Sequence, residues 1–304
     1  MRLIVYNPKG GAAIWKSRLD HAIAELQSQP MASALVATEA RDMAGPVRRA
    51  LASHPDVTQV VACGGDGTVA ACVAALDGRQ IPVAVIPTGT SNVLAFELGL
   101  PRHAVKAARL LRGPTRAVPF TTWRVNDQTM ILELGVGFDG MLMWRTPRSV
   151  KRALGFVGVS LSAMRHSVAF DYAPVRVTGT LASGEERSVV ATSVLVANCK
   201  RWAGPQILVP SADPSDDIID VLLLQYASFP QLVAFWLAIL LPGAPHLRLP
   251  FVEHVRMRRL RIEALGRQVD AHVDGEPTLT TPIDVTRLGL VHLLGPAAVS
   301  SRGS

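Results

Sequence analysis

The stretch VTQVVACGGDGTVAACVAAL, residues 57–76, decides the fold of the first part of the chain. An apolar, β-branched run ends in Gly-Gly-Asp-Gly-Thr, and an alanine-rich run with helical spacing follows. This order predicts a strand, a tight turn and a helix. Glycines after a strand let the main chain approach a ligand, and amides that open a helix favour phosphate oxygens. The turn lacks both the Walker pattern and the spacing of a dinucleotide fingerprint.

A single glycine turn also has an ordinary steric explanation, so the neighbouring segments matter. Strands are expected at 3–7, 33–38, 57–63 and 81–87, with helices at 14–29 and 43–54. This alternation predicts a parallel sheet with helices on both faces, whose ligands bind at the carboxyl ends of the strands. NPKGG (7–11), Thr38 and PTGTSN (87–92) follow the other three strands. Four small or hydroxyl-bearing turns are therefore expected at one edge of the sheet.

From about residue 116 the pattern changes to short strands separated by turn residues, which predicts a mostly antiparallel β-sandwich domain. The expected strands are 117–125, 128–137, 174–181, 187–198, 218–225, 255–265, 267–273 and 281–288. Two helices are expected to interrupt them, at about 148–168 and 229–241. We therefore expect an α/β domain over 1–115 and a β-rich domain over 116–288, with 289–304 packing back on the first domain.

Composition limits the class of protein. The chain has 304 residues, of which 49% are hydrophobic and 18% charged, so a folded body is expected rather than disorder. The longest apolar run, LVAFWLAILL (232–241), is shorter than the about 20 residues that a bilayer span needs, so it indicates a buried or interfacial helix. The start MRLIVYNPKGG lacks a leader pattern, and a cytoplasmic location is expected.

Charge and cysteine content narrow the partners. The net charge of +7 favours anionic partners, and an aromatic content of 5% without a recognisable module argues against nucleic acid. Cys63, Cys72 and Cys199 have no metal-ligand spacing and are expected to be core thiols. The histidines show no pair at ligand spacing, and His272 is interpreted as a surface or core residue.

Five motifs carry a resemblance to a known family: NPKGG, GGDGT, PTGTSNVLAFELGLP (87–101), GVGFDG (135–140) and VDGEP (273–277). In this order and spacing they resemble the diacylglycerol kinase catalytic family, which includes bacterial lipid kinases and sphingosine kinases and is related in fold to NAD kinases. The resemblance spans nearly the whole chain. It implies an ATP-dependent transfer of the terminal phosphoryl group to a lipid hydroxyl, with ATP and Mg²⁺ held between the two domains.

The resemblance also implies roles for individual residues. The nucleotide contacts become Asn7, Thr38, Gly64, Gly65, Asp66, Gly67, Thr68, Gly89, Thr90 and Asn92. Asp274 becomes the general base for the lipid hydroxyl, and Glu276 lies near the nucleotide or the metal. Phosphoryl transfer needs positioning, neutralised phosphate charge and one carboxylate for the alcohol, which this set can supply. An ordinary Asp-Gly hairpin turn is the alternative interpretation of Asp274.

The sequence departs from the family pattern at two places. Ala70 and Ala71 stand where the family has Asn-Glu, so the ATP and metal contacts are made elsewhere, the affinity for ATP is reduced, or the nucleotide is handled differently. Asp216 and Asp217 precede Ile218, where the family has a glycine. These two acids suit a structural Mg²⁺ site, because hard cations prefer carboxylate oxygens, but solvated loop acids are an equal alternative.

Two basic segments suggest a peripheral contact with an anionic membrane surface. The first is the expected helix at 148–168, with arginines and lysine among apolar residues from Trp144 to Arg165. The second is HVRMRRLRI (254–262), an expected strand with a bulge at Arg258–Arg259. Both segments can equally present their charges to water. The sequence leaves the oligomeric state open, with a homodimer as one option.

The leading hypothesis is thus a peripherally membrane-associated lipid kinase that uses ATP and Mg²⁺ and a lipid alcohol acceptor such as diacylglycerol. An NAD kinase-like enzyme with a soluble acceptor is the second hypothesis. A nucleotide-binding regulatory protein with impaired catalysis is the third, and Ala70 and Ala71 favour it.

Overall fold

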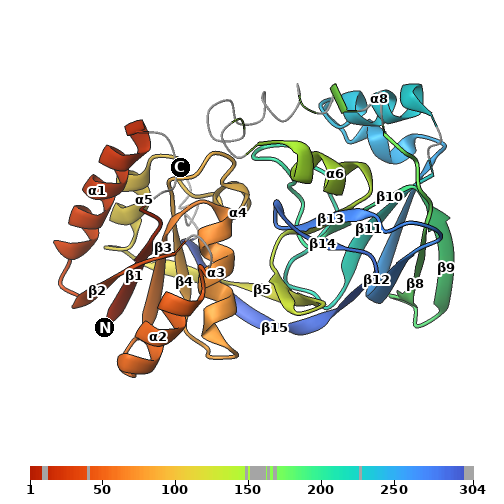
Figure 1. Ribbon diagram of the computed structural model, residues 1–304. Helices are drawn as coiled ribbons and strands as arrows, with labels where there is room; N and C mark the ends of the chain where they lie inside the picture. The colour runs from red at the N-terminus through yellow and green to blue at the C-terminus, as the bar shows by residue number, and fades with distance from the viewer. Residues whose placement is uncertain are drawn as a thin grey trace, which may run out of the picture. The chain divides into compact units, whose positions relative to one another are not determined.

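The computed structural model describes residues 1–8, 13–39, 42–147, 150, 162, 165–166, 170–225 and 228–297 (Figure 1). The chain folds into two compact units. One contains Met1–Phe120 and the segment that begins at Leu290, and the other is Thr121–Gly289. Most of the helix expected at 148–168, and residues 9–11 of NPKGG, lie outside the described residues. None of the described helices has the length and apolar character needed to cross a membrane.

The first unit is an α/β unit with a parallel sheet, which confirms the expected fold class. Its strands pair in the order β15-β4-β3-β1-β2, and each of these pairs is parallel. Its elements are β1 (Arg2–Tyr6), α1 (Ala13–Gln27), β2 (Ser33–Ala37), α2 (Gly45–Ser53), β3 (Gln59–Gly64), α3 (Asp66–Leu76), β4 (Val83–Pro87), α4 (Val93–Glu97) and α5 (Ala104–Leu110). Strands β5 (Thr115–Val125) and β15 (Ile283–Pro296) each extend into both units.

Helices cover the two faces of this sheet (Figure 1). Helices α1 and α5 pack together and share one apolar cluster with alternate residues of the strands, among them Ile4, Val61 and Ile86. Helices α2 and α3 pack on each other and on the sheet. Because both faces are covered, the strands are apolar along most of their length, as is usual for parallel sheets.

The second unit is antiparallel, as expected. Its strands pair in the order β14-β13-β7-β10-β11-β12-β15, β8 pairs with β12 and β9, and β5 pairs with β6. Its elements are β6 (Gln128–Met130), β7 (Glu133–Val136), α6 (Phe138–Arg145), β8 (Val175–Leu181), β9 (Glu186–Ala191), β10 (Ser193–Ala197), β11 (Ile219–Leu224), α8 (Phe229–Ala238), the 3₁₀ helix η1 (Pro245–Arg248), β12 (Val252–Ala264), β13 (Asp270–Val273) and β14 (Glu276–Thr280).

Strands β10 and β11 are buried on both faces. Val194 and Val196 of β10 belong to a cluster formed by the strands, whereas Leu195 and Ala197 belong to a second cluster that includes residues of α6 and α8. Strand β11 divides its residues in the same way. This two-sided burial explains why IIDVLLLQ (218–225) is almost continuously apolar in a sheet whose strands are antiparallel.

Several strand predictions need correction. The strand expected at 128–137 is divided into β6 and β7, because the amides of Ile131 and Leu132 bind a side chain instead of a neighbouring strand. The strand expected at 187–198 is divided into β9 and β10, which pair with different partners. The bulge expected near Arg258–Arg259 is confirmed by a register shift between Met257 and Arg259.

Candidate functional site

The carboxyl ends of β1, β2, β3 and β4 meet at one edge of the first sheet. Tyr6 stands opposite both Ala37 and Cys63, and Gly64 stands opposite Pro87. The main chain continues this alignment one step further, since the Thr38 amide donates to the Tyr6 carbonyl at 2.9 Å and the Thr88 amide to the Gly64 carbonyl at 3.0 Å. Asn7, Thr38 and the turns that begin at Gly64 and Pro87 therefore start along the same edge.

Two of the glycines in these turns pack against each other through their main chains. A Cβ built on Gly89 would lie 2.5 Å from the Gly65 Cα, and one built on Gly65 would lie 3.2 Å from the Gly89 Cα. At Gly64, a Cβ would meet the side chain of Thr68, whose Oγ1 would be 2.1 Å away. Gly67 differs, because nothing lies within 4 Å of a Cβ there. A Cβ at Gly89 therefore has no room beside the main chain of Gly65, whereas one at Gly64 would have to displace the Thr68 side chain.

Asp66 joins the two glycine turns. Its carboxylate accepts hydrogen bonds from the amides of Val93 and Leu94, each at 3.0 Å, and so caps the start of α4. Burial raises the pKa of Asp66 above its ordinary value, and these two amide hydrogen bonds oppose the shift. The side chain was predicted to contact the nucleotide, whereas its oxygens here fix the position of the second turn.

Asn92 closes the second turn on itself. Its Oδ1 accepts from the Gly89 amide at 3.0 Å, its Nδ2 donates to the Gly89 carbonyl at 2.6 Å, and its φ of 47° lies in the left-handed region. Asparagine tolerates this conformation better than most residues do. Asn92 therefore shapes the turn, and a direct contact with a nucleotide stays a prediction.

The hydrogen bonds described above do not involve the side chains of three other predicted nucleotide contacts, Asn7, Thr38 and Thr90. Thr90 is exposed, and Asn7 is partly buried at the end of β1. Thr38 is 6% exposed, and its Oγ1 has no hydrogen-bond partner among the described residues. A buried hydroxyl without a partner is costly in a folded protein and points to a ligand or a water molecule. Gly65 is the N-cap residue of the eleven-residue helix α3, and within the described part of the chain no side-chain hydrogen bond caps the start of this helix.

Asp274 and Gly275 of the Asp-Gly-Glu motif form the two-residue turn between β13 and β14, and Glu276 begins β14. Asp274 and Gly275 have φ values of 50° and 80°, as a type I′ hairpin turn requires, and Val273 pairs with Glu276. The Asp274 carboxylate accepts three main-chain hydrogen bonds, from Ile131 at 3.0 Å, Leu132 at 2.8 Å and Glu133 at 2.9 Å. Three of its about four acceptor positions are thus used inside the protein.

Glu276 differs from Asp274 in exposure. It begins β14 as an exposed residue, whereas Asp274 is partly buried. The Glu276 carboxylate is therefore more accessible to an external alcohol than the Asp274 carboxylate is. The sequence could not make this distinction, because an Asp-Gly-Glu turn places two acids within three residues and the anchoring amides come from 131–133.

A buried acid and histidine behind this turn were missed. Asp139 and His272 are each 1% exposed, and the His272 Nε2 lies 2.7 Å from the Asp139 Oδ2. The GVGFDG motif contains Asp139, and His272 lies two residues before Asp274. Neither the GVGFDG motif nor the residue before VDGEP indicates this pair, because only the ladder between β7 and β13 brings the two side chains together.

The acidic pair Asp216–Asp217 binds arginines. Asp216 pairs with Arg256 at 2.5 Å, and Asp217 pairs with Arg258 at 2.7 Å. Among the described residues, no group of three or more histidines, cysteines and acids could hold a metal ion. The Mg²⁺ site at this pair stays a prediction, and both acids have other partners.

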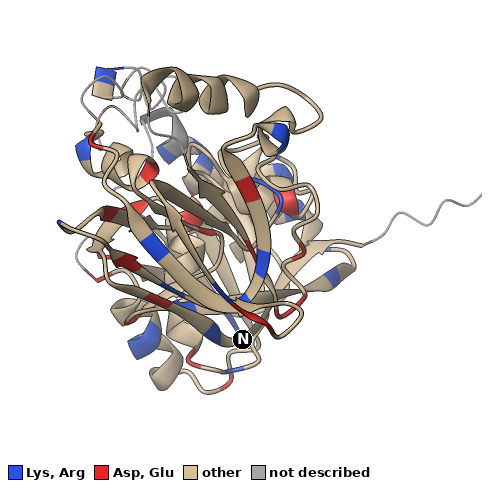
Figure 2. Cartoon of the chain, turned by 90° about the vertical axis from the view of Figure 1, so that its right-hand side faces the viewer, with Lys and Arg blue, Asp and Glu red and all other residues tan. Residues whose placement is uncertain are grey.

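The same arrangement changes the interpretation of the basic strand at 254–262. Arg259 pairs with Glu186 at 3.2 Å, and Arg261 pairs with Asp284 at 2.7 Å. Figure 2 shows basic and acidic residues interleaved on the strands of this unit. These arginines are therefore matched by carboxylates within the protein, which weakens the case that the strand binds lipid phosphates.

The two units define a fold class: an α/β unit and an antiparallel β unit of the kind found in NAD kinases and diacylglycerol kinases. The model of the diacylglycerol kinase catalytic domain matches residues 2–123, and the model of the YegS C-terminal NAD kinase beta sandwich-like domain matches residues 134–298. The chain belongs to the diacylglycerol kinase catalytic family, as the motifs indicated.

Similar proteins include a relative named as a diacylglycerol kinase and one without an assigned function. A diacylglycerol kinase of Bacillus subtilis (strain 168) is 28% identical over 282 residues, which cover 90% of this chain and 88% of that protein. An uncharacterized protein of Synechocystis sp. is 29% identical over 174 residues, and the match covers 54% of this chain but only 40% of that protein. The crystal structure of a diacylglycerol kinase from Bacillus anthracis str. Sterne has a TM-score of 0.72 and 22% identity, covering 95% of this chain and 96% of that one. This last similarity concerns the fold alone.

Proposed function

We propose that this protein is an ATP-dependent lipid kinase that transfers the γ-phosphoryl group to the hydroxyl of diacylglycerol or a related lipid alcohol. Family membership supports the reaction class, and the edge of the first sheet supports the nucleotide. The observation that carries the proposal is the close packing of Gly65 and Gly89, which brings two turns together with no side chain between them.

The residues at this edge suit a polyphosphate. The start of α3 offers main-chain amides in a partly positive field, and phosphate oxygens accept from such amides. The open space at Gly67 leaves room beside these amides. The buried Thr38 hydroxyl is an additional donor that lacks a partner among the described residues. In this proposal Asn7, Thr38, Gly67 and Thr90 contact the nucleotide, while Asp66 and Asn92 hold the turns.

Magnesium enters this proposal with the nucleotide. Because the described residues contain no group of three potential ligands, a site made only of protein side chains does not fit. Mg²⁺ commonly binds through substrate phosphates and water with one or two carboxylates. When bound in that way, the ion neutralises phosphate charge. No residue of this chain is assigned to it.

The acceptor chemistry is assigned to the Asp-Gly-Glu turn. The lipid hydroxyl oxygen forms a bond to the γ-phosphorus, the bond from that phosphorus to the β–γ bridging oxygen breaks, and ADP leaves. A carboxylate takes the hydroxyl proton. We assign this role to Glu276, because it is exposed, and assign Asp274 to the shape of the turn, because its oxygens accept three amides. In this proposal Glu276 takes the role of general base that the family resemblance implies for Asp274.

Helix α8, which is labelled in Figure 1, and the residues that follow it supply the proposed contact with the membrane surface. Leu237 and Leu241 are each 59% exposed, and Leu240 is 49% exposed. From Phe229 to Leu247 the sequence contains no lysine, arginine or acid, and its one histidine, His246, is buried. An uncharged segment with exposed leucines is suited to the boundary between headgroups and acyl chains. The acceptor of a lipid kinase resides in such a bilayer.

The test is phosphate transfer from γ-labelled ATP to diacylglycerol, a sphingoid base and other lipid alcohols in mixed micelles. Transfer to at least one lipid, lost in Glu276→Gln, is expected. Transfer to NAD without detergent would instead indicate an NAD kinase-like enzyme. Binding of ATP without any transfer would indicate the regulatory protein that Ala70 and Ala71 suggest.

A further inference from the structure

His272 is placed where it touches both α6 and the Asp-Gly-Glu turn. Its Nδ1 accepts a hydrogen bond from the Gly275 amide at 3.1 Å, and its Nε2 faces the Asp139 Oδ2 at 2.7 Å. An amide can only donate, so Nδ1 carries no proton and Nε2–H donates to Asp139. One tautomer thus links an acid in the first turn of α6 to the amide in the middle of the hairpin turn.

The surrounding main chain leaves space for this link. Gly135 stands opposite His272 in the β7–β13 ladder, and a Cβ on Gly135 would lie 2.3 Å from the His272 Nε2 and 2.4 Å from the Asp139 Oδ2. The register between β13 and β14 shifts between Ala271 and Val273, so His272 sits at an irregularity in the hairpin. Such irregularities change the direction in which a side chain points.

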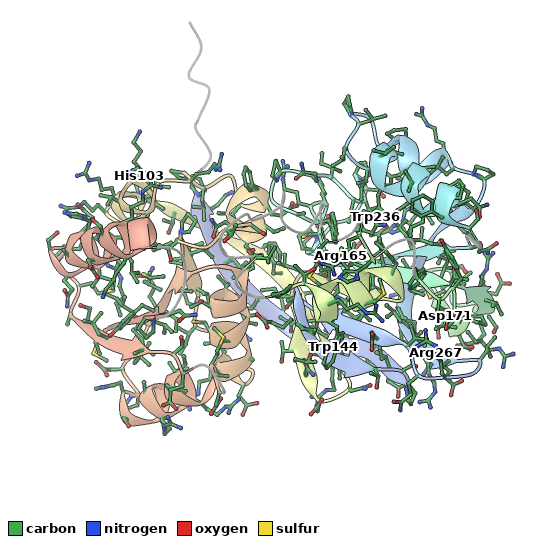
Figure 3. All side chains as sticks on the ribbon, turned by 45° about the horizontal axis from the view of Figure 1, so that its top comes forward. His103, Trp144, Arg165, Asp171, Trp236 and Arg267 are labelled. Carbon is green, nitrogen blue, oxygen red and sulfur yellow. The ribbon has the colours of Figure 1, made fainter. Side chains whose placement is uncertain are left out.

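Further contacts hold α6 and β13 in a fixed relation. Trp144, labelled in Figure 3, donates its Nε1–H to the Ala271 carbonyl at 3.1 Å. The Gly137 amide donates to the Asp270 carbonyl at 3.1 Å. A Cβ on Gly140 would lie 2.1 Å from that same carbonyl oxygen. The glycines of GVGFDG therefore allow α6 to lie directly against the strand that carries His272.

We propose that Asp139 and His272 are positioning residues that fix the Asp-Gly-Glu turn, and through Gly275 the carboxylate of Glu276. This inference rests on the proposed function, because it assigns the turn to phosphoryl transfer. The Asp139 carboxyl group accepts the hydrogen bond of the His272 Nε2–H. The His272 Nδ1 in turn accepts the hydrogen bond of the Gly275 amide. Neither side chain needs to touch a substrate, since both are buried.

Two substitutions at His272 separate the two hydrogen bonds. In His272→Gln, the amide group lies near the position of Nε2, so it can donate to Asp139 but offers no acceptor to Gly275. In His272→Asn, the amide group lies near the position of Nδ1, so it can accept from Gly275 but leaves Asp139 buried without its donor. A buried carboxyl group that loses its hydrogen-bond donor destabilises a fold, whereas a displaced turn acts on the reaction.

The measurements are Tm, kcat, KM for ATP, and hydrogen exchange of a peptide covering 270–280. His272→Gln is expected to keep Tm within about 3 °C, to keep KM for ATP within about twofold, to lose about 10- to 100-fold in kcat and to exchange faster in that peptide. His272→Asn is expected to lower Tm more than His272→Gln does, but to retain at least about fivefold more kcat.

Asp139→Asn keeps an oxygen that accepts from Nε2–H, and should therefore retain more kcat than His272→Gln. The exposed His103→Gln, in the other unit, is the control (Figure 3).

A His272→Gln protein with wild-type kcat and wild-type exchange at 270–280 would overturn the inference. So would equal kcat losses in the glutamine and asparagine variants, which would mean that His272 acts only through stability. Failure of the proposed function is distinguishable, because it would remove transfer from the wild-type protein. The exchange comparison would still test whether His272 fixes the turn.

Discussion

Gly65 and Gly89 pack so closely that a Cβ on Gly89 would come within 2.5 Å of the Gly65 Cα. This nearest atom belongs to the main chain and cannot move aside as a flexible side chain would. Gly89→Ala is therefore expected to push the two turns apart, to destabilise the fold by about 1–3 kcal/mol and to weaken ATP binding. Urea unfolding and calorimetry with ATP measure the two effects.

Gly67→Ala separates folding from binding. A Cβ on Gly67 meets nothing within 4 Å, so the fold should keep its stability to within about 1 kcal/mol. If phosphate oxygens bind the amides at the start of α3, the added methyl should raise the Kd for ATP severalfold. Gly113→Ala, in the loop after α5, adds a methyl whose nearest neighbour is 3.8 Å away and should change neither quantity. An unchanged Kd in Gly67→Ala would argue against a phosphate position beside Gly67.

Asp66 gives a pH dependence with a defined sign. Its pKa is raised in the folded state, so the folded protein binds this proton more tightly than the unfolded chain does. The contribution of Asp66 to the free energy of unfolding therefore falls as the pH rises from near its ordinary 3.8 through the folded-state pKa. The Asp66→Asn variant has no carboxyl group at this position and does not show this fall with pH. Its free energy of unfolding should be lower than that of the wild type by about 1–3 kcal/mol, because one amide of α4 loses its acceptor.

The difference in stability between wild type and Asp66→Asn should accordingly narrow as the pH rises. Urea unfolding of both proteins between about pH 4 and pH 7 measures it. A difference that widens over this range would mean that the amides of Val93 and Leu94 outweigh the effect of burial.

The cysteines should be unreactive in the folded protein. Cys63, Cys72 and Cys199 are free and buried, and burial raises the pKa of Cys63 to about 12 and that of Cys72 still further. At pH 8 the thiolate fraction of Cys63 is then on the order of 10⁻⁴, and the thiolate is the reactive form. Titration with a thiol reagent should label none of the three until denaturant is added, and kinase activity should survive the treatment.

Much of the first unit followed from local pattern. Strands β1 to β4 and the turns after them could be located because apolar runs and glycines alternate at short range, and parallel strands must present their carboxyl ends on one edge. What the sequence could not assign was the role of each turn residue. Asp66 caps a helix that begins 27 residues later, and Asn92 bonds to Gly89 within its own turn. Polar residues in such a turn serve the fold or a ligand, and spacing alone does not distinguish them.

In the second unit, the contacts that local sequence patterns could not predict join residues that lie far apart in the sequence. Ile131 and Leu132 continue an apolar run, so 128–137 resembled one strand, but their amides donate to Asp274, more than 140 residues away. His272 gave no local signal, because its partner Asp139 is brought to it only by the pairing of β7 with β13. Motif order identified the family, whereas the proposed division of roles between Asp274 and Glu276 rests on three-dimensional contacts.

The exposed leucines around the end of α8 predict binding to vesicles. Leu237→Ser combined with Leu241→Ser removes two side chains that are each 59% exposed, so the fold should be unaffected. Because each buried leucine contributes about 1.5–3 kcal/mol when fully withdrawn from water, binding to phosphatidylcholine–phosphatidylglycerol vesicles should fall about 10-fold or more. Sedimentation with the vesicles measures the effect.

The matched control for this pair is Leu265→Ser. Leu265 is 41% exposed in the same unit but follows β12, away from α8 in sequence. Vesicle binding should be unchanged in this variant. Activity on a water-soluble short-chain acceptor should be retained by all these proteins. Equal loss of vesicle binding in the control would mean that general surface hydrophobicity, not α8, determines binding.

Asp274 and Glu276 should respond differently to removal of their charge. Asp274→Asn turns an NH₂ group or a weaker acceptor toward the amides of 131–133, so it should destabilise the fold by about 1.5–3 kcal/mol for each hydrogen bond lost. Glu276→Gln changes an exposed side chain and should leave stability within about 0.5 kcal/mol, yet lower kcat by about 10²- to 10⁴-fold with ATP binding retained. Glu185→Gln, exposed in the turn between β8 and β9, is the control for a lost surface charge. If Asp274→Asn instead kept its Tm and lost all turnover while Glu276→Gln stayed active, the proton acceptor would be Asp274, and its three amide hydrogen bonds would have to open during the reaction.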